Sequence, residues 1–249
     1  MQNTNLEVYE QLMIPARQQF ETSYGLATLL EEDIEPDYLE LFLVYFCAIG
    51  AQMTAPVEGW IRRAGERCTA LGLNEIGDAL HRHSKAEAGH DQLMLADVKS
   101  LVGRWNACKH WQLDLEHLLH LPQTPGVARY VEVHEDNICG PNPFAQIAIE
   151  YEIERLTLLH GERLVARCVR LCGDDILACL TFLPKHIELD GGHTKFNARE
   201  LTKVIEANPS SVPTLVAAGS AALDAYGTFI SDCLGHAKDQ LARLAPSNC

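Results

Sequence analysis

The eight residues His186-Ile187-Glu188-Leu189-Asp190-Gly191-Gly192-His193 set the main expectations for this chain. A helix has 3.6 residues per turn, so positions i, i+4 and i+7 lie on one face. The spacing therefore predicts that His186, Asp190 and His193 point the same way. Two imidazoles and one carboxylate on one face are the ligand set of an oxygen-activating non-haem iron site. Each of the two glycines lowers helix propensity by about 1 kcal/mol relative to alanine, so we expect another group to approach the helix closely there.

A second stretch, His83-Ser84-Lys85-Ala86-Glu87-Ala88-Gly89-His90, repeats the same order and spacing of histidine, acid and histidine. The pattern predicts one long helix over about 73–102. In such a helix Glu87 and His90 share a face, and an inward-facing Glu-x-x-His is the arrangement used by di-iron carboxylate bundles. His83 precedes Glu87 by one turn and would lie on the same face.

Between these stretches lies Phe144-Ala145-Gln146-Ile147-Ala148-Ile149-Glu150-Tyr151-Glu152-Ile153-Glu154, with three glutamates inside an apolar run. Glu150 and Glu154 share one helical face, whereas Glu152 is expected on a solvent-exposed face. A carboxylate that faces a core is costly unless it is paired or bound to a metal. The alternative to a metal site is pairing of these acids with Arg63, Arg163 or Arg167, and the residues alone leave both interpretations open.

Almost every other segment also has helical spacing of its apolar residues, so we expect one all-α domain over residues 1–249. It should contain about seven to nine helices, with the apolar segment from Tyr38 to Met53 at the centre. No alternating strand pattern and no internal repeat is present. The other long helices are expected over about 6–24, 59–71, 144–171, 176–197, 198–207 and 212–244. The irregular part between 103 and 143 is expected to hold at most two short helices, over 113–119 and 127–134.

Composition narrows the classes of function. The chain of 249 residues carries 34 acidic and 20 basic residues, a formal net charge of −14, which disfavours binding to nucleic acid. No apolar run reaches the roughly 18 residues of a membrane span, and no export signal is visible, so we expect a cytoplasmic protein that does not bind membranes. None of the nine cysteines forms a CxxC pair. Cys168 and Cys172, four residues apart, are the one cysteine pair with metal-binding spacing.

The combined pattern resembles the haem-oxygenase-like di-iron oxidases and oxygenases, a family also described as iron-containing redox enzymes. Residues 182–193 are similar to that family's signature almost position by position. The family has Glu-x-x-His on one helix, a lone Glu on a later helix, and then His-x-x-x-Asp-x-x-His. The lone Glu is best matched by Glu154, which has Pro143 before it and Leu156-Thr157 after it; Glu150 is the alternative. Transferred to this chain, the family's metal ligands are Glu87, His90, Glu154, His186, Asp190 and His193.

The resemblance implies a haem-oxygenase-like bundle that binds two Fe(II) ions, with manganese as an alternative, and uses dioxygen as co-substrate. A peroxo di-iron intermediate would act on a small organic molecule, an amino acid, amine or carboxylate. It implies no catalytic residue beyond the ligands. His83 is not part of the family pattern, and we interpret it as a neighbour of the site or an alternative ligand. The pocket wall is expected to include Tyr45, Phe46, Tyr151 and Phe182.

Two other classes of function remain open. One is a metal-free enzyme on the same fold, such as a thiaminase-like enzyme or a cofactor-less oxidase. The other is a non-catalytic binding protein. The only expected partner is the small-molecule substrate, and a homodimer stays open.

Overall fold

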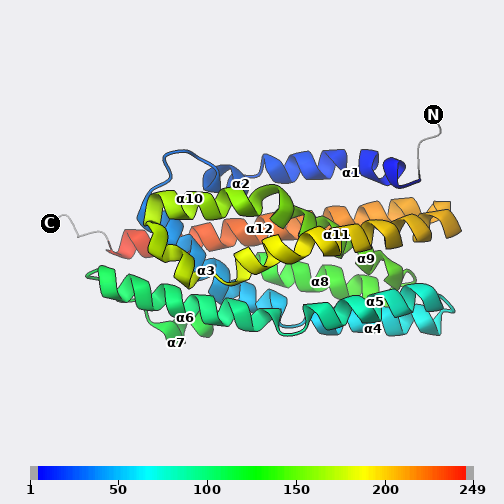
Figure 1. Ribbon diagram of the computed structural model, residues 1–249, viewed down its shortest axis with the longest axis horizontal. Helices are drawn as coiled ribbons and strands as arrows, with labels where there is room; N and C mark the ends of the chain where they lie inside the picture. Colours follow the sequence, from blue (N-terminus) through cyan, green and yellow to red (C-terminus); the bar gives the residue numbers. More distant parts are fainter. Residues whose placement is uncertain (1–4, 245–249) are drawn as a thin grey trace.

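The structure is a computed structural model that describes residues 5–244, a range that excludes Cys249. This part of the chain is α-helical and contains no strand. The helices run mostly along the long axis of the molecule and form an elongated bundle (Figure 1). Its α-helices are α1 (Asn5–Glu21), α2 (Tyr24–Leu29), α3 (Pro36–Thr54), α4 (Val57–Ala70), α5 (Asn74–Glu87), α6 (His90–Cys108), α7 (Leu115–Leu119), α8 (Pro125–Cys139), α9 (Gln146–Leu156), α10 (Glu162–Cys172), α11 (Phe182–Ala207) and α12 (Val212–Leu244).

Four short helical turns connect these elements. The turn η2 is π-helical and joins α9 to α10 without a break in the helix, so among residues 5–244 nine long helices remain when α2 and α7 are left aside. The all-α class is confirmed. The turns are η1 (Pro143–Ala145), η2 (Thr157–Gly161), η3 (Asp174–Cys179) and η4 (Pro209–Ser211).

Helix α3 forms the centre of the bundle. The side chain of Glu35 caps its first turn by accepting a hydrogen bond from the Tyr38 amide, and Pro36 has the backbone angle that a first turn requires. Every residue over 39–51 is buried, packed mainly against α6 and α12. By length and composition the stretch Pro36–Ala70 could cross a membrane, but 72% of its apolar window is buried inside the fold, as in a core helix.

The prediction of one helix over 73–102 is wrong. Helix α5 ends at Glu87 and α6 begins at His90, and the two residues between them turn the chain. Gly89 adopts a left-handed backbone conformation with φ of +83°, which glycine alone among the residues adopts without steric cost. In contrast, the expected helices over 176–197 and 198–207 are continuous from Phe182, and α11 is 26 residues long.

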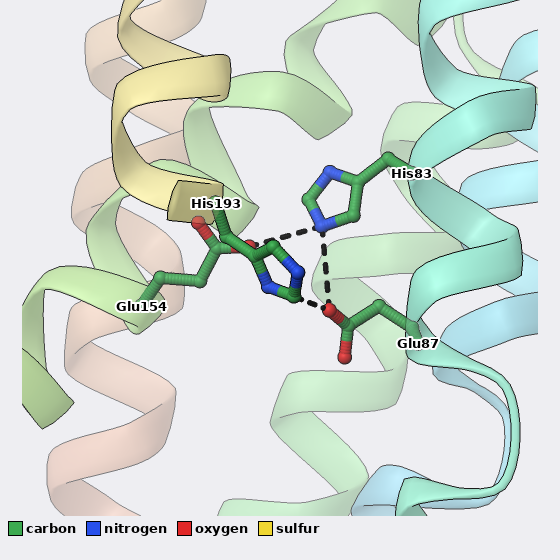
Figure 2. Close-up of side chains that lie close together, drawn as sticks. All are labelled: His83, Glu87, Glu154 and His193. Carbon is green, nitrogen blue, oxygen red and sulfur yellow. Dashed lines mark ion pairs between the residues drawn. The ribbon is translucent and has the colours of Figure 1, made fainter. Parts of the chain in front are cut away.

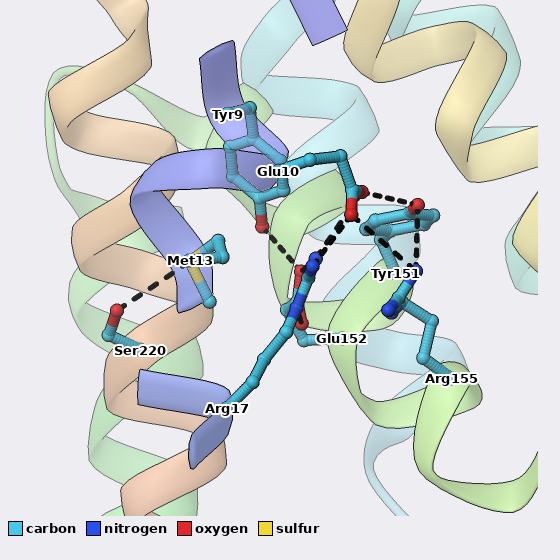
Figure 3. A network of polar contacts seen from close by, with 8 residues as sticks. All are labelled: Tyr9, Glu10, Met13, Arg17, Tyr151, Glu152, Arg155 and Ser220. Carbon is cyan, nitrogen blue, oxygen red and sulfur yellow. Dashed lines mark hydrogen bonds and ion pairs between the residues drawn. The ribbon is translucent and has the colours of Figure 1, made fainter. Parts of the chain in front are cut away.

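Helix α1 is attached to the bundle through a buried acid on α9. Glu152 accepts hydrogen bonds from Arg17 at 2.7 and 2.8 Å and from the Tyr9 hydroxyl at 2.9 Å (Figure 3). Arg17 also pairs with Glu10, which accepts a hydrogen bond from Tyr151. The expectation that Glu152 faces solvent is therefore wrong, because α1 covers that side of α9 and supplies the cation. Glu152 is only 1% exposed.

Candidate metal centre

Two groups of potential metal ligands lie in the core and share Glu87. The first contains His83, Glu87, Glu154 and His193, and the second contains Glu87, His90 and His186. Within each group, one donor atom per residue lies within 4.8 Å of every other. The donors come from four helices, α5, α6, α9 and α11, so the bundle brings together residues more than 100 positions apart in the sequence.

In the first group, two imidazoles and two carboxylates face one another (Figure 2). His83 Nε2 lies 3.0 Å from Glu154 Oε1 and 3.5 Å from Glu87 Oε1. His193 Nδ1 lies 3.1 Å from Glu87 Oε1 and 3.8 Å from Glu154 Oε1. The second oxygen of Glu154 accepts a hydrogen bond of 2.8 Å from the Asn197 side chain, which holds the carboxylate in place.

In the second group, His90 and His186 lie on the other side of Glu87. His90 Nδ1 is 2.8 Å from Glu87 Oε2, and the His90 and His186 rings are 4.6 Å apart between centroids. His186 Nδ1 is 2.8 Å from the Phe182 carbonyl, to which it donates a hydrogen bond. This bond fixes the tautomer, so Nε2 keeps its lone pair for a metal.

Asp190, the middle residue of the His186–His193 stripe, is buried beside the first group. Its Oδ1 lies 3.6 Å from His193 Nδ1. Neither carboxylate oxygen has a partner in hydrogen-bond geometry. The nearby Thr157 side chain acts to lower the pKa of Asp190. Burial, reinforced by the charge of Glu154, raises the pKa of Asp190 to about 7. All three side chains of the α11 stripe therefore reach the same region, as its spacing predicted.

The break between α5 and α6 changes how Glu87 and His90 meet. They do not share a face of one helix, as the Glu-x-x-His spacing predicted. Glu87 is the last residue of α5 and His90 the first of α6, and the left-handed Gly89 folds the two ends toward each other. The two residues are brought together as expected, but by a turn instead of a helical face.

The close approach occurs at a different glycine from those expected. A Cβ on Gly191 or Gly192 would meet no atom within 4 Å, so nothing packs against them. A Cβ on Gly161 would lie 2.9 Å from Ile187 of α11. Gly161 ends the π-helical turn that follows Glu154, and π turns inside helices are frequent at functional sites. This turn places α9 and α10 against the helix that carries the histidine stripe.

In the candidate centre, the glutamates and the histidines shift one another's pKa values toward the charged forms. Burial acts to raise the pKa of Glu87, but contacts with His193, His83 and His90 hold it far below its usual value. Burial likewise acts to lower the pKa of His83, whereas Glu154 and Glu87 hold it well above the usual value. Burial lowers the pKa of His186. In the absence of metal, the imidazole of His83 therefore holds a proton between two carboxylates. A metal cation bound there would displace this proton, because a ligand histidine must be neutral.

The unsatisfied atoms of the site fit metal ions. Three atoms of the first group, His83 Nε2, Glu154 Oε1 and His193 Nδ1, are buried and have no partner in hydrogen-bond geometry. The same holds for both oxygens of Asp190, which lies next to His193. Buried polar atoms in proteins are otherwise nearly always satisfied. Carboxylate and imidazole donors without a thiolate suit iron or manganese. Among the described residues, Cys168 and Cys172 belong to no group with metal-binding distances.

Glu150 lies beside the centre but outside both donor groups. It is 5% exposed, and its Oε1 accepts a hydrogen bond of 2.6 Å from Gln146. Gln146 is 2.7 Å from His134 Nδ1, and the His134 ring is stacked on Trp60 with centroids 4.1 Å apart. Burial raises the pKa of Glu150 to about 8, with Glu154 and Glu87 adding to the shift and His83 opposing it.

A small pocket of about 80 Å³ adjoins the centre. The end of the pocket nearest the donor groups contains Glu87, Glu154, His186 and Asp190, and no lysine or arginine lines the pocket. Of the four aromatic residues expected in its wall, Phe182 alone lines it. Tyr45 stacks on His236, Phe46 packs behind Phe182, and Tyr151 belongs to the α1 contact. The remaining wall includes Met53, Met94, Tyr130, Tyr226 and Phe229.

Sequence reasoning missed two residues that hold the candidate ligands in place. Asn197 lies four residues after His193 and therefore on the same face of α11, and Gln146 lies four residues before Glu150 on α9. Both could have been found by extending the ligand-bearing face by one turn. The pairing of the buried glutamates with Arg63, Arg163 or Arg167 is absent from the described contacts, in which Arg63 pairs with Glu135.

Comparisons with known proteins identify the fold. No family model and no curated protein matches the sequence. A domain of unknown function from Shewanella denitrificans OS217, solved with a haem-oxygenase-like fold, aligns with 98% of this chain and 96% of its own at a TM-score of 0.71 and 14% identity. A CADD-like protein of unknown function from Nostoc punctiforme PCC 73102 aligns with 93% of this chain and 99% of its own at a TM-score of 0.61 and 14% identity. The chain has a haem-oxygenase-like fold.

Proposed function

We propose that this haem-oxygenase-like chain is a non-haem di-iron enzyme that uses dioxygen to oxidise a small organic substrate. The observation that carries the proposal is the convergence of imidazole and carboxylate donors from four helices on two adjoining groups. Buried atoms of His83, Glu154 and His193 in the first group have no partner in hydrogen-bond geometry. In this proposal the ligands are Glu87, His90, Glu154, His186, Asp190 and His193. Manganese in place of iron is compatible with the same donors.

His83 is proposed as an additional ligand. Its ring is buried at the end of α5, and Nε2 faces the same space as the oxygens of Glu87 and Glu154. Phe196 packs edge-on against the ring, with centroids 5.6 Å apart and the planes at 84°, which limits its rotation. With His83 the first group offers two imidazoles and two carboxylates before Asp190 is counted.

Two ferrous ions would supply electrons that reduce dioxygen beside the substrate. The chain's own residues then have distinct tasks. Glu87 directs Oε1 toward His193 and Oε2 toward His90, so it is placed to bridge the two groups. Asn197 holds Glu154 and the Phe182 carbonyl holds His186. The apolar wall of Met53, Met94 and Phe229 limits access of water to the reacting region.

The proposal is tested by metal reconstitution. Anaerobic addition of Fe(II) or Mn(II) to metal-free protein, followed by removal of unbound metal, should leave about two ions per chain by elemental analysis. Glu87→Ala should bind markedly less than the parent, because it removes the donor shared by both groups, and His186→Ala should lose one site. His120→Ala changes a side chain that is 77% exposed and serves as the control.

Two outcomes would count against this function. Metal-free protein that binds neither iron nor manganese would favour a metal-free enzyme or a binding protein on this fold. Equal metal content in Glu87→Ala and the parent would show that the bound ions lie elsewhere. Dioxygen consumption by the iron-loaded parent, absent in Glu87→Ala, is the corresponding functional measurement.

A further inference from the structure

We infer that the substrate is a small amine and that Glu150 is its ammonium-binding residue. The inference rests on the proposed function, because it concerns the pocket beside the same centre. It goes further by naming a substrate class and the residue that recognises it. The observation behind it is a buried carboxyl group that lines the pocket, belongs to neither donor group and forms no ion pair with a side chain of the described residues.

Glu150 is held in a built environment. Gln146 donates a hydrogen bond of 2.6 Å to Oε1, and Gln146 is itself fixed by contact with His134 at 2.7 Å. His134 is completely buried and lies flat against Trp60, with an angle of 9° between the rings. Three packed side chains behind Glu150 therefore fix its orientation. Such support is expected for a group that must present a carboxylate in a defined position.

The second oxygen of Glu150 is the one available to a ligand. Among the described residues, Gln146 is the only hydrogen-bond donor to this carboxyl group, through Oε1, and no lysine, arginine or histidine forms an ion pair with it. A buried carboxylate without a cation is costly. A ligand ammonium group within hydrogen-bond distance removes that cost by favouring the charged form.

The rest of the pocket selects for a small, mostly apolar amine. Met53, Met94 and Phe229 supply apolar wall, and Tyr130 and Tyr226 are the aromatic residues with hydroxyl groups. The volume of about 80 Å³ admits only a few heavy atoms. A carboxylate substrate finds no lysine or arginine in this lining, so side-chain recognition favours an amine over an acid of the same size.

The test compares n-butylamine, 1-butanol and butyrate, which differ only in the polar end. Each is titrated into protein loaded with the redox-inert Zn(II), and binding is followed by ligand-observed NMR and by competition between the three compounds. The parent should bind the amine at least tenfold more tightly than the alcohol or the acid. Glu150→Gln, which keeps the shape and removes the charge, should abolish that preference. Glu162→Gln makes the same change on an exposed face of α10 and should bind like the parent.

Metal content is measured on the same samples, so the two proposals fail separately. A parent that binds no metal counts against the di-iron function. A parent that keeps its metal but binds the three compounds equally, or a Glu150→Gln protein with unchanged amine preference, overturns the Glu150 assignment alone. Loss of metal in Glu150→Gln would also overturn it, because Glu150 would then be a ligand. Circular dichroism confirms that each variant is folded.

Discussion

At the scale of single residues, His83 has the environment that most requires an explanation. Its Nε2 lies between two carboxylates, yet neither ring nitrogen has a partner in hydrogen-bond geometry. A histidine that served only to orient Glu154 would be expected to make a well-formed hydrogen bond to it. A metal bound between the four donors of the first group would satisfy the ring nitrogen and both carboxylates at once.

The first residue-scale prediction follows from this environment. His83→Asn should bind metal at least tenfold more weakly in the first group, while the second group keeps its ion. Equilibrium dialysis against Mn(II) with elemental analysis should show the content falling from about two ions per chain toward about one. His120→Asn, on an exposed side chain, should match the parent. Unchanged affinity in His83→Asn would remove His83 from the ligand set.

The second residue-scale prediction concerns acid stability. Burial lowers the pKa of His134 to about 3 from the usual 6.5. Between about pH 3 and pH 6.5 the imidazole of His134 is therefore protonated in the unfolded chain and neutral in the folded chain. Stability falls as the pH drops below about 6.5, by up to about 1.4 kcal/mol per pH unit from this group.

The measurement is urea unfolding of the parent and His134→Gln at pH 7, 6 and 5. The parent should be the more stable at pH 7, because His134 stacks on Trp60 and contacts Gln146. Its advantage should shrink as the pH falls, since the variant has no imidazole to protonate. An advantage that is constant over this range would contradict the assignment of a neutral, buried His134.

At the scale of elements, the junction of α5 and α6 determines how the two donor groups are connected. Glu87 and His90 close the ends of different helices, and Gly89 between them has φ of +83°. Any residue with a side chain is strained in that conformation. The junction is thus both a helix terminus and a part of the site.

A pair of glycine substitutions tests this interpretation. Gly89→Ala should lower the free energy of unfolding by about 1–2 kcal/mol, because alanine is strained at a positive φ, and should weaken metal binding through Glu87 and His90. Gly191→Ala lies inside α11 with no atom within 4 Å of the added Cβ, and should raise it by about 0.5–1 kcal/mol. Urea denaturation of the metal-free proteins measures both. Changes of the same sign would contradict the proposed role of Gly89.

At the scale of the whole molecule, the buried contact between α1 and α9 links helix α1 to the helix that carries the candidate ligand Glu154. Glu152 on α9 binds Tyr9 and Arg17 of α1 (Figure 3). Glu154, two residues later, faces the donors of the first group (Figure 2). One face of α9 thus holds α1 through Glu152, and the opposite face carries the candidate ligand Glu154. A shift of the α9 backbone would therefore disturb both.

Removal of Arg17 should accordingly be severe. Arg17→Ala leaves the nearly inaccessible Glu152 without its cation, a change that costs about 3–5 kcal/mol in comparable buried pairs. Arg62→Ala is the control, because Arg62 pairs with two exposed glutamates on its own helix and such pairs contribute under about 1 kcal/mol. Thermal unfolding and limited proteolysis of α1 report the difference. A small effect of Arg17→Ala would show that the contact is not a main attachment of α1.

The sequence by itself determined the all-α class and pointed to the residues that the structure brings together as candidate donors. Helical periodicity is local, so it predicted the α11 stripe, the central position of α3 and the breaks near Pro143 and Asn208. The types and spacing of His186, Asp190 and His193 indicated metal-binding chemistry without any knowledge of packing.

Only the tertiary structure decided which side chains meet and which face each one takes. The turn at Gly89 separates α5, which packs on α4, from α6, which packs on α3, and no local spacing encodes this difference. Glu152 is buried because α1 covers it, and its partner Arg17 lies 135 positions earlier in the sequence. Glu150 and Glu154 share a helical face, yet Glu154 alone reaches the donors, since their positions depend on Gln146, Asn197 and the π turn. The physical reason is that periodicity fixes directions around one helix axis, whereas distances between helices depend on how all of them pack.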